Sequence, residues 1–409
     1  MPLELEFSKT FDFTIKVQKT IGIPCCFEPY PDTLRAKLKA NFGFITSFAI
    51  LAYCVLGQLI NVVLLLIGHR KTEEAMEEIA IQIVCTGFCI TGLIKMYGLA
   101  YHRNLLTSII DDFRVMWAEE LLSSADRQIC DKVLRPTMAI AAFAAIGNII
   151  MVSAFNFLPV AEMIFNHWQT GKWHRLQPYV IWFPFDGTGG WWYYLVYTFE
   201  VYGGYVVAVS NVGTNCIFCL LCAHLTMQLK LLNRSLEDVI QPEEANKRRL
   251  VQRDAREMLP KLIRRHQSLL SCKETMDAVF SLTFFLNFAA STIIMCVQGF
   301  LMLIADFYVV TKIALFMGCC LVEIFFLCYY GDEVLENSTQ LAQAVYNCRW
   351  YHQDAGDCKF SKNLIPIILR AQRPMKLMAW KFWPITINTF GMILNASWSY
   401  FTLLRTVVL

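Results

Sequence analysis

The sequence predicts an all-α membrane protein with seven transmembrane helices, a cytoplasmic amino terminus and an extracellular carboxyl terminus. Three observations support this prediction. The 409 residues are 56% hydrophobic and only 17% charged, which is more apolar than a soluble domain needs. Seven runs have the length and composition of a membrane span, and Lys and Arg gather on one side of them. Lipid is therefore the expected solvent for most of the chain.

The seven spans follow from runs with few or no charged residues. A hydrocarbon core about 30 Å thick needs about 20 apolar residues in a helix. The runs cover residues 41–68, 79–94 with a continuation to 101, 136–161, 201–229, 278–305, 307–330 and 382–404. Lys95 interrupts the second run near its end, where we expect the side chain to snorkel. The sixth run carries Lys312 and Glu323, so it should face protein rather than lipid.

The orientation follows from the positive residues. Residues 1–40 contain six Lys and Arg and no apolar stretch typical of a signal peptide, so the first span should act as its own insertion signal. With the amino terminus inside, 29 of the 36 Lys and Arg fall in cytoplasmic segments and five in outer segments. Positive residues favour the cytoplasmic side. This orientation is the reverse of that of a G-protein-coupled receptor.

The spans divide the chain into four regions, which are a cytoplasmic segment (1–40), a six-helix bundle (41–330), a cytoplasmic helix and loop (331–379) and the last helix (380–409). Within the bundle, residues 223–275 should form a basic helical hairpin below the membrane. Leu225, Leu229 and Leu232 continue the helical spacing of the fourth span, and Pro242 marks the turn. The arginines of its second arm indicate either a solvated face beside anionic lipid or a site for a partner.

Residues 159–190 form the long outer loop, which is rich in aromatic residues and carries Pro159, Pro178 and Pro184. One interpretation is an aromatic belt at the membrane interface. The other is a folded lid over a cavity between the helices. The length of the loop and its prolines favour the lid.

No residue pattern indicates catalysis, a cofactor or a nucleic-acid partner. Walker, His-Glu-x-x-His and Gly-x-Ser-x-Gly motifs are absent from the sequence, as is a polybasic run. None of the 16 cysteines falls in the outer segments, so a disulfide scaffold is not expected. Cysteine also packs well as a small apolar residue, which explains the spacing of Cys216, Cys219 and Cys222. Cys348, His352 and Cys358 lack a clear fourth zinc ligand. We therefore expect no metal site.

Polar residues inside the spans are candidates for function, because ionisable groups are costly in lipid. They include Gln58, Asn61, Asn148, Ser153, Glu200, Ser210 and Asn211. Lys312 and Glu323 are eleven residues apart, so they share a helix face without touching. Each needs another partner, either in an interhelical or snorkelling contact or in a transport relay.

The carboxyl-terminal third resembles the insect odorant receptor signature. The residues that carry the resemblance are Gly331, Ala344-Val345-Tyr346, Trp350, Arg370 to Pro374, Phe390 and Ser399-Tyr400-Phe401. The inverted topology and the outer loop with Trp182-Phe183-Pro184 fit the family as well. The resemblance implies an odorant-binding subunit of a ligand-gated, non-selective cation channel, which forms a tetramer with a shared co-receptor in the plasma membrane of sensory neurons. It also implies a cytoplasmic helical anchor region where the subunits meet.

The resemblance places the pore on the last helix, with a gate at Leu403, Thr406 and Val407. Leu403 and Val407 are four residues apart and share a face, with Thr406 alongside. In a pore they would form a hydrophobic constriction. Simple lipid-facing residues would show the same spacing.

The resemblance also places a small volatile ligand in the outer half of the bundle, among spans two, three, four and six. The candidate lining residues are Ile81, Val84, Cys85, Phe88, Ile146, Ile150, Ser153, Phe157, Tyr197, Val201, Tyr205, Tyr308, Leu315 and Phe316. Such a pocket suits a mostly apolar ligand oriented by one or two hydrogen bonds. Core packing would give the same composition.

Other function classes stay open at this point. A gustatory-type channel shares the topology, a metabotropic seven-helix receptor needs the opposite orientation, and a secondary transporter usually shows an internal repeat, which the sequence lacks. Glycans at the sequons of Asn233 or Asn337 would favour the metabotropic class.

Overall fold

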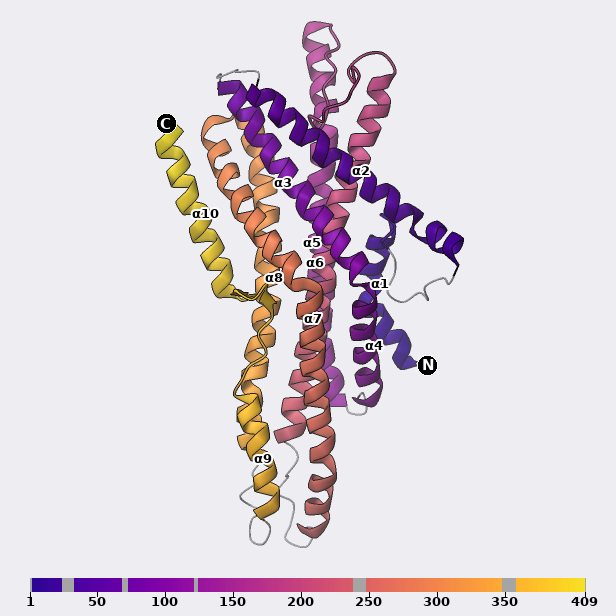
Figure 1. Ribbon diagram of the computed structural model, residues 1–409, viewed down its shortest axis with the longest axis vertical. Coiled ribbons are helices and arrows are strands. Elements are labelled where there is room, and N and C mark those ends of the chain that lie inside the picture. The colour runs from indigo at the N-terminus through magenta and orange to yellow at the C-terminus, as the bar shows by residue number, and fades with distance from the viewer. Residues whose placement is uncertain are drawn as a thin grey trace.

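The computed structural model describes residues 2–23, 33–67, 73–120, 124–237, 248–347 and 358–408. These residues form long helices arranged roughly along one axis (Figure 1). The helices are α1 (Pro2–Lys19), α2 (Leu34–Ile67), α3 (Glu73–Tyr101), α4 (Arg103–Glu120), α5 (Ser124–Thr170), α6 (Trp192–Glu237), α7 (Arg248–Ile304), α8 (Phe307–Asn347), α9 (Cys358–Ala371) and α10 (Ile387–Val408). Two short strands, β1 (Met378–Ala379) and β2 (Trp383–Pro384), form an antiparallel hairpin before α10.

Six helices among the described residues are long and apolar enough to cross a membrane. They contain the segments Asn41–Ile67, Met76–Tyr101, Asp126–Thr170, Trp192–Glu237, Met258–Ile304 and Val309–Asn347. The predicted helical membrane fold is therefore confirmed for the first six spans. The seventh, α10, has 22 residues, which is about 33 Å of helix. The helix α10 is not among these six, because residues such as Asn388, Asn395 and Ser399 make it less apolar than the spanning stretches of the other helices.

The start of α10 differs from the start of the apolar run. The run begins at residue 382, but the helix begins at Ile387, because residues 378–384 form the β hairpin. The hairpin is fixed to α7, since the Met378 amide donates to the Asp277 carboxylate (3.0 Å) and the Trp380 amide donates to the Ser281 carbonyl (2.9 Å). The all-α prediction did not include this short sheet.

The long helices continue beyond the predicted spans. The helix expected after Gly331 is the second half of α8, which runs unbroken from Phe307 to Asn347. A Cβ atom at Gly331 would lie 2.2 Å from the carbonyl oxygen of Ile385. Glycine at this position therefore lets the segment before α10 lie directly against α8. Likewise, α5 continues through residues 159–170 of the predicted outer loop.

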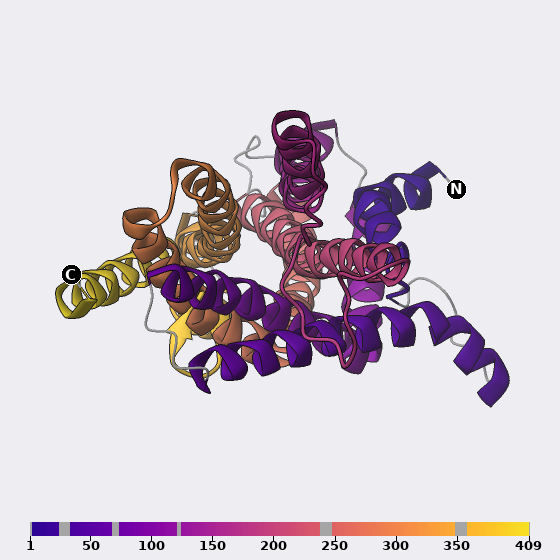
Figure 2. The same cartoon turned by 90° about the horizontal axis from the view of Figure 1, so that it is seen from above.

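The centre of the molecule is α6, whose residues 206–229 are all buried. Phe218 on α6 packs edge-on against Phe284 on α7, with ring centroids 4.5 Å apart, and Phe280 and Phe288 extend this column of rings. By contrast, α10 lies at one edge of the molecule, as the view along the long axis shows (Figure 2). The core is thus built around α6, and α10 is attached at its side.

The two ends of the molecule differ in what they carry. The connection between α5 and α6 and the carboxyl-terminal end of α10 lie at one end, and α9 lies at the other with the far ends of α6, α7 and α8 (Figure 1). The amino-terminal helix α1 packs against the α9-side half of α6 through aromatic contacts. The Phe11 ring stacks on His224 at 5.0 Å, and Thr10 Oγ1 lies 3.0 Å from His224 Nε2.

Candidate ligand-binding site

A cavity lies in the half of the bundle that carries the α5–α6 connection. Its volume is about 40 Å³, and it adjoins an outer pocket of about 230 Å³ with which it shares Gln58, Cys85, Phe155 and Tyr179. Its walls come from α2, α3, α5, α6 and α8, and its roof comes from the α5–α6 connection. The lining residues are Cys54, Gln58, Cys85, Phe88, Cys89, Met151, Val152, Phe155, Tyr179, Ile181, Glu200, Gly203, Gly204, Val207 and Phe316. Most of these side chains are apolar, which is typical of small-molecule sites in proteins.

Residues 171–191 form the roof, and hydrogen bonds fasten this segment to the helices. The Trp182 amide donates to the Gly57 carbonyl on α2 (3.2 Å), and the Tyr53 hydroxyl donates to the Trp182 carbonyl (3.2 Å). Arg175 ties the segment together by donating to the carbonyls of Thr188 and Gly190. Burial raises the pKa of the Tyr179 phenol well above its usual value, so this ring enters the cavity uncharged.

Two glycines on α6 make room for the groups that line the cavity. A Cβ atom at Gly204 would lie 2.7 Å from the Tyr179 hydroxyl oxygen, and one at Gly203 would lie 2.9 Å from Cys54 Sγ. Both distances are shorter than side chains normally allow. The glycine pair therefore lets the roof and α2 approach the α6 backbone closely.

The polar groups of the cavity are few. Glu200 is completely buried, and its Oε2 accepts one long hydrogen bond from the Tyr179 amide (3.5 Å). Glu200 Oε1 and Gln58 Oε1 are buried without a hydrogen-bond partner. Buried polar groups normally find partners, so these two oxygens are available to a bound molecule.

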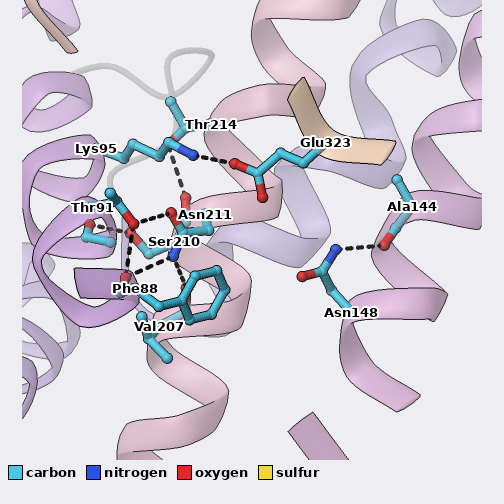
Figure 3. A network of polar contacts seen from close by, with 11 residues as sticks. Phe88, Thr91, Lys95, Ala144, Asn148, Val207, Ser210, Asn211, Thr214 and Glu323 are labelled. Atoms are coloured by element: carbon cyan, nitrogen blue, oxygen red, sulfur yellow. Dashed lines mark hydrogen bonds and ion pairs between the residues drawn. The ribbon is translucent and has the colours of Figure 1, made fainter. Parts of the chain in front are cut away.

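The floor of the cavity combines aromatic rings with a polar layer. The Phe88 and Phe316 rings meet edge to face at 5.0 Å. Next to these rings, Asn211 Nδ2 donates to the carbonyls of Phe88 (3.2 Å) and Val207 (3.1 Å), and Thr91 Oγ1 donates to Asn211 Oδ1 (3.2 Å) (Figure 3). These bonds join α3 to α6.

One helical turn after Thr91 along α3, a buried ion pair joins α3 to α8. Lys95 Nζ lies 2.6 Å from Glu323 Oε1, and the side chains are 0% and 11% exposed (Figure 3). The prediction that Lys95 snorkels is therefore wrong, because the ammonium group points into the bundle toward a carboxylate. The interhelical contact expected for Glu323 is confirmed. Lys312 is half-buried near the start of α8.

The structure brings three of the predicted ligand-binding residues together, since Cys85, Phe88 and Phe316 line the cavity. Val84 is buried on the same helix, and Ile81 lines an adjoining outer pocket that shares Gln58, Cys85 and Tyr179 with the cavity.

The other predicted positions lie outside the cavity lining. The Ser153 and Tyr205 hydroxyls bond to each other (2.9 Å), and the Tyr197 hydroxyl donates to the Asn156 carbonyl. Val201 is half-buried. Four side chains are exposed, namely Ile146, Ile150, Phe157 and Leu315. Tyr308 lies in α8, but its side chain is outside the described residues.

Sequence reasoning did not assign α2 or the roof to the ligand site. Tyr179 and Ile181 belong to an irregular segment, which has no periodicity to reveal which side chains point inward. Glu200 and Gln58 were named as candidates for function because both are polar residues in apolar surroundings, but they were not assigned to the ligand site. Cys54 and Gly204 carried no such signal.

The predicted gate lies on the exposed side of α10. Leu403 is 58% exposed, and the exposed Thr406 donates its hydroxyl to the Leu403 carbonyl (2.8 Å). Val407 is helical, but its side chain lies outside the described residues. An open groove of about 690 Å³ lies between α10 and α7, and Leu403 borders it.

The cysteines do not assemble a metal site in the part of the chain that the structure describes, where no group of three His, Cys, Asp or Glu residues has suitable geometry. Cys216, Cys219 and Cys222 are buried in the helix packing of α6. Cys348 and His352 lie outside the described residues.

Comparisons with known proteins give a consistent result. A family model described as 7tm Odorant receptor matches residues 75–398. Odorant receptor 85b of Drosophila melanogaster is 26% identical over 330 residues, which cover 78% of this chain and 80% of that protein. Putative odorant receptor 92a of the same species is 25% identical over 409 residues, which cover 98% and 96%.

The fold also matches a solved structure. The olfactory receptor OR5 from Machilis hrabei, in complex with eugenol, superimposes with a TM-score of 0.80 over 98% of this chain and 99% of that chain, at 16% sequence identity. The two proteins therefore share their fold despite little sequence similarity.

Proposed function

Because this chain belongs to the 7tm odorant receptor family, we propose that it is the odorant-binding subunit of a ligand-gated, non-selective cation channel. It works with a shared co-receptor, as a heterotetramer, in the plasma membrane of olfactory neuron dendrites. The observation that carries the proposal is the roofed, mostly apolar cavity with two unpartnered polar oxygens. Such a site suits a small volatile molecule that is oriented by one or two hydrogen bonds.

Residues 171–191 act as a lid over the bound odorant. Tyr179 and Ile181 line the cavity, and the hydrogen bonds to α2 hold the lid in place. An odorant enters through the outer pocket, which shares Gln58, Cys85 and Tyr179 with the cavity.

The amino terminus lies in the cytoplasm and the lid lies outside. The distribution of Lys and Arg supports this orientation. In the same orientation α9 and the long ends of α6, α7 and α8 form the cytoplasmic anchor, where subunits meet.

The last helix, α10, lines the pore. Its exposed face carries a polar stripe, which consists of Asn388, Asn395, Ser399, Thr402 and Thr406. A polar stripe is unfavourable against lipid but suits a water-filled path between subunits. Leu403, Thr406 and Val407 form the gate near the end of this path, where a ring of apolar side chains closes the pore by dewetting.

The test is whole-cell current in cells that express this chain with and without the family co-receptor, during exposure to a panel of small volatiles. We expect current only when both chains are present, and we expect it to persist when G-protein signalling is blocked. Current that disappears under that block would support the metabotropic alternative. Current from this chain with tastants and without the co-receptor would support the gustatory-type alternative.

Orientation needs a separate test, because the natural sequons do not provide one. The side chains of Asn233 and Asn337 are buried, and Asn233 Nδ2 donates to the Asn337 carbonyl (3.0 Å). A glycan on either side chain would disrupt this packing, so these sequons report poorly on the orientation of the folded protein. A new sequon in the exposed lid, made by Lys172→Asn with His174→Thr, should gain a glycan. A matched sequon on α7, made by Met258→Asn with Pro260→Thr, should not. The opposite pattern would reverse the topology.

A further inference from the structure

The carboxyl group of Glu200 is an unusual feature of the cavity wall. Its side chain is fully buried among apolar residues and borders the free space. Among the described residues, none of the ion pairs involves Glu200. The other titratable groups that border the cavity are one phenol and three thiols, none of which carries a positive charge, and they belong to Tyr179, Cys54, Cys85 and Cys89. In the described part of the chain, the group thus has no cationic partner at the cavity wall.

An unpaired carboxylate is too costly to maintain in such surroundings, so the group keeps its proton. A neutral carboxyl group has one oxygen that is the better acceptor and one that carries the O–H donor. The Tyr179 amide donates to Oε2 (3.5 Å), which identifies Oε2 as the acceptor oxygen. Oε1 has no partner and therefore carries a free O–H donor at the cavity wall.

We propose that Glu200 recognises the odorant by donating a hydrogen bond from Oε1 to a carbonyl oxygen, so that the preferred ligands are neutral volatile ketones, aldehydes or esters. This inference rests on the proposed function of the cavity and adds the chemical class of its ligand. The apolar part of the ligand packs against Phe88, Phe155 and Phe316, which lie on α3, α5 and α8.

The second unpartnered oxygen, Gln58 Oε1, does not change this assignment. Gln58 borders both the cavity and the outer pocket. Glu77 and Glu78 border the outer pocket. Water in the outer pocket can satisfy its amide oxygen. Glu200 borders the inner cavity and not the outer pocket, so a ligand in the inner cavity can reach its O–H group.

The test compares ligands that share one carbon skeleton, namely 2-hexanone, 2-hexanol, 2-aminohexane and hexane. Current is recorded from this chain with the co-receptor, for the wild type and for Glu200→Gln and Glu200→Leu. We expect 2-hexanone to be the most potent of the four on the wild type. The amide of Glu200→Gln still offers an N–H donor, so the half-maximal concentration of 2-hexanone should stay within about threefold, whereas Glu200→Leu should raise it about tenfold. Glu162→Leu, which removes an exposed glutamate on α5, serves as the control and should change nothing.

Two outcomes would overturn the inference. One is an unchanged response to 2-hexanone in Glu200→Leu. The other is a response that is strongest for 2-aminohexane and is lost in Glu200→Gln, since it would require an ionised carboxylate.

A measurement on the purified full-length chain separates this inference from the proposed function. In lipid nanodiscs, 2-hexanone should raise the midpoint of thermal unfolding of the wild type and of Glu200→Gln but not of Glu200→Leu. Should this pattern hold while no volatile evokes current with the co-receptor, the ligand class stands and the channel function fails. If the ketone stabilises none of the three proteins, the inference itself fails, whatever the currents show.

Discussion

The helices α6 and α10 differ in how they are surrounded. Residues 206–229 of α6 are all buried by neighbouring helices of the same chain, and its polar residues Ser210 and Asn211 are hydrogen-bonded to α3. In contrast, α10 packs mainly against α7 and α8, and its other face is exposed and carries a polar stripe beside apolar side chains such as Trp398 and Leu403. The interior of one subunit explains the sequence of α6. The polar stripe on the exposed face of α10 is instead what the proposed pore between subunits would require.

The largest expected effect tests the interior around α6. Lys95→Met removes the partner of Glu323 and leaves a buried carboxylate unpaired. We expect this change to reduce the free energy of unfolding by about 3–5 kcal/mol, seen as a lower midpoint of thermal unfolding and poor surface expression. The double variant Lys95→Met with Glu323→Leu should recover most of the loss. Full stability of the single variant would show that the pair does not hold α3 to α8.

Removing one aromatic ring beside α6 and one on α10 tests the difference between the two helices. Phe284 is fully buried against Phe218, so Phe284→Ala should cost about 3–5 kcal/mol of stability. Trp398 on α10 is 67% exposed, so Trp398→Ala should change the stability of the isolated subunit by less than about 0.5 kcal/mol. It should instead weaken assembly with the co-receptor, measured by co-purification. Equal losses of stability in both variants would contradict the contrast between α6 and α10.

A smaller effect is expected where α6 meets the lid. Gly204→Ala places a Cβ atom against the Tyr179 hydroxyl, and the overpacking should cost about 1–3 kcal/mol. The same displacement of the lid should lower odorant potency. Gly147→Ala on α5 is the matched control, because no atom lies within 4 Å of its added Cβ, and its thermal midpoint and dose response should match those of the wild type.

The smallest effect on stability belongs to the gate. Leu403→Ser leaves the subunit fold intact because the side chain is exposed, but it should raise the leak current and alter the ratio of cation permeabilities. Ile164→Ser, an exposed position on α5, is the control and should leave both quantities unchanged. Permeability that is insensitive to substitutions at Leu403 and Val407 would remove the gate from α10 while leaving the family assignment intact.

The membrane helices were predictable from sequence because a charge-free run of about 20 residues matches the thickness of the hydrocarbon core and is uncommon in soluble domains. The start of α10 was not, because the apolar run continues through the hairpin at residues 378–384. That hairpin depends on Trp380, which has a φ of 53°, and on contacts with Asp277 and Ser281 on another helix. The sequence around the hairpin gives no signal for contacts with residues about 100 positions away.

The cavity was predictable only in part, because helix periodicity gives the spacing of a face but not its direction. Cys85 and Phe88 on α3 and Phe316 on α8 line the cavity, whereas Ile150 and Leu315, chosen by the same reasoning, line a separate pocket between α5, α6 and α8. The pair of Lys95 and Glu323 joins residues 228 positions apart. Only packing in three dimensions decides such partners.

The attachment of α10 has a mechanical consequence. The start of the helix is fixed, because the β hairpin is hydrogen-bonded to α7 and the backbone at Ile385 lies against Gly331 of α8. The helix is about 33 Å long, and further along it Ser397 Oγ also donates to the Thr292 carbonyl of α7 (3.3 Å). A tilt of about 5° at the start of a helix of this length would displace its other end by about 3 Å. We therefore expect a small shift of α8 beside the proposed odorant site to be amplified at Leu403, where we place the gate.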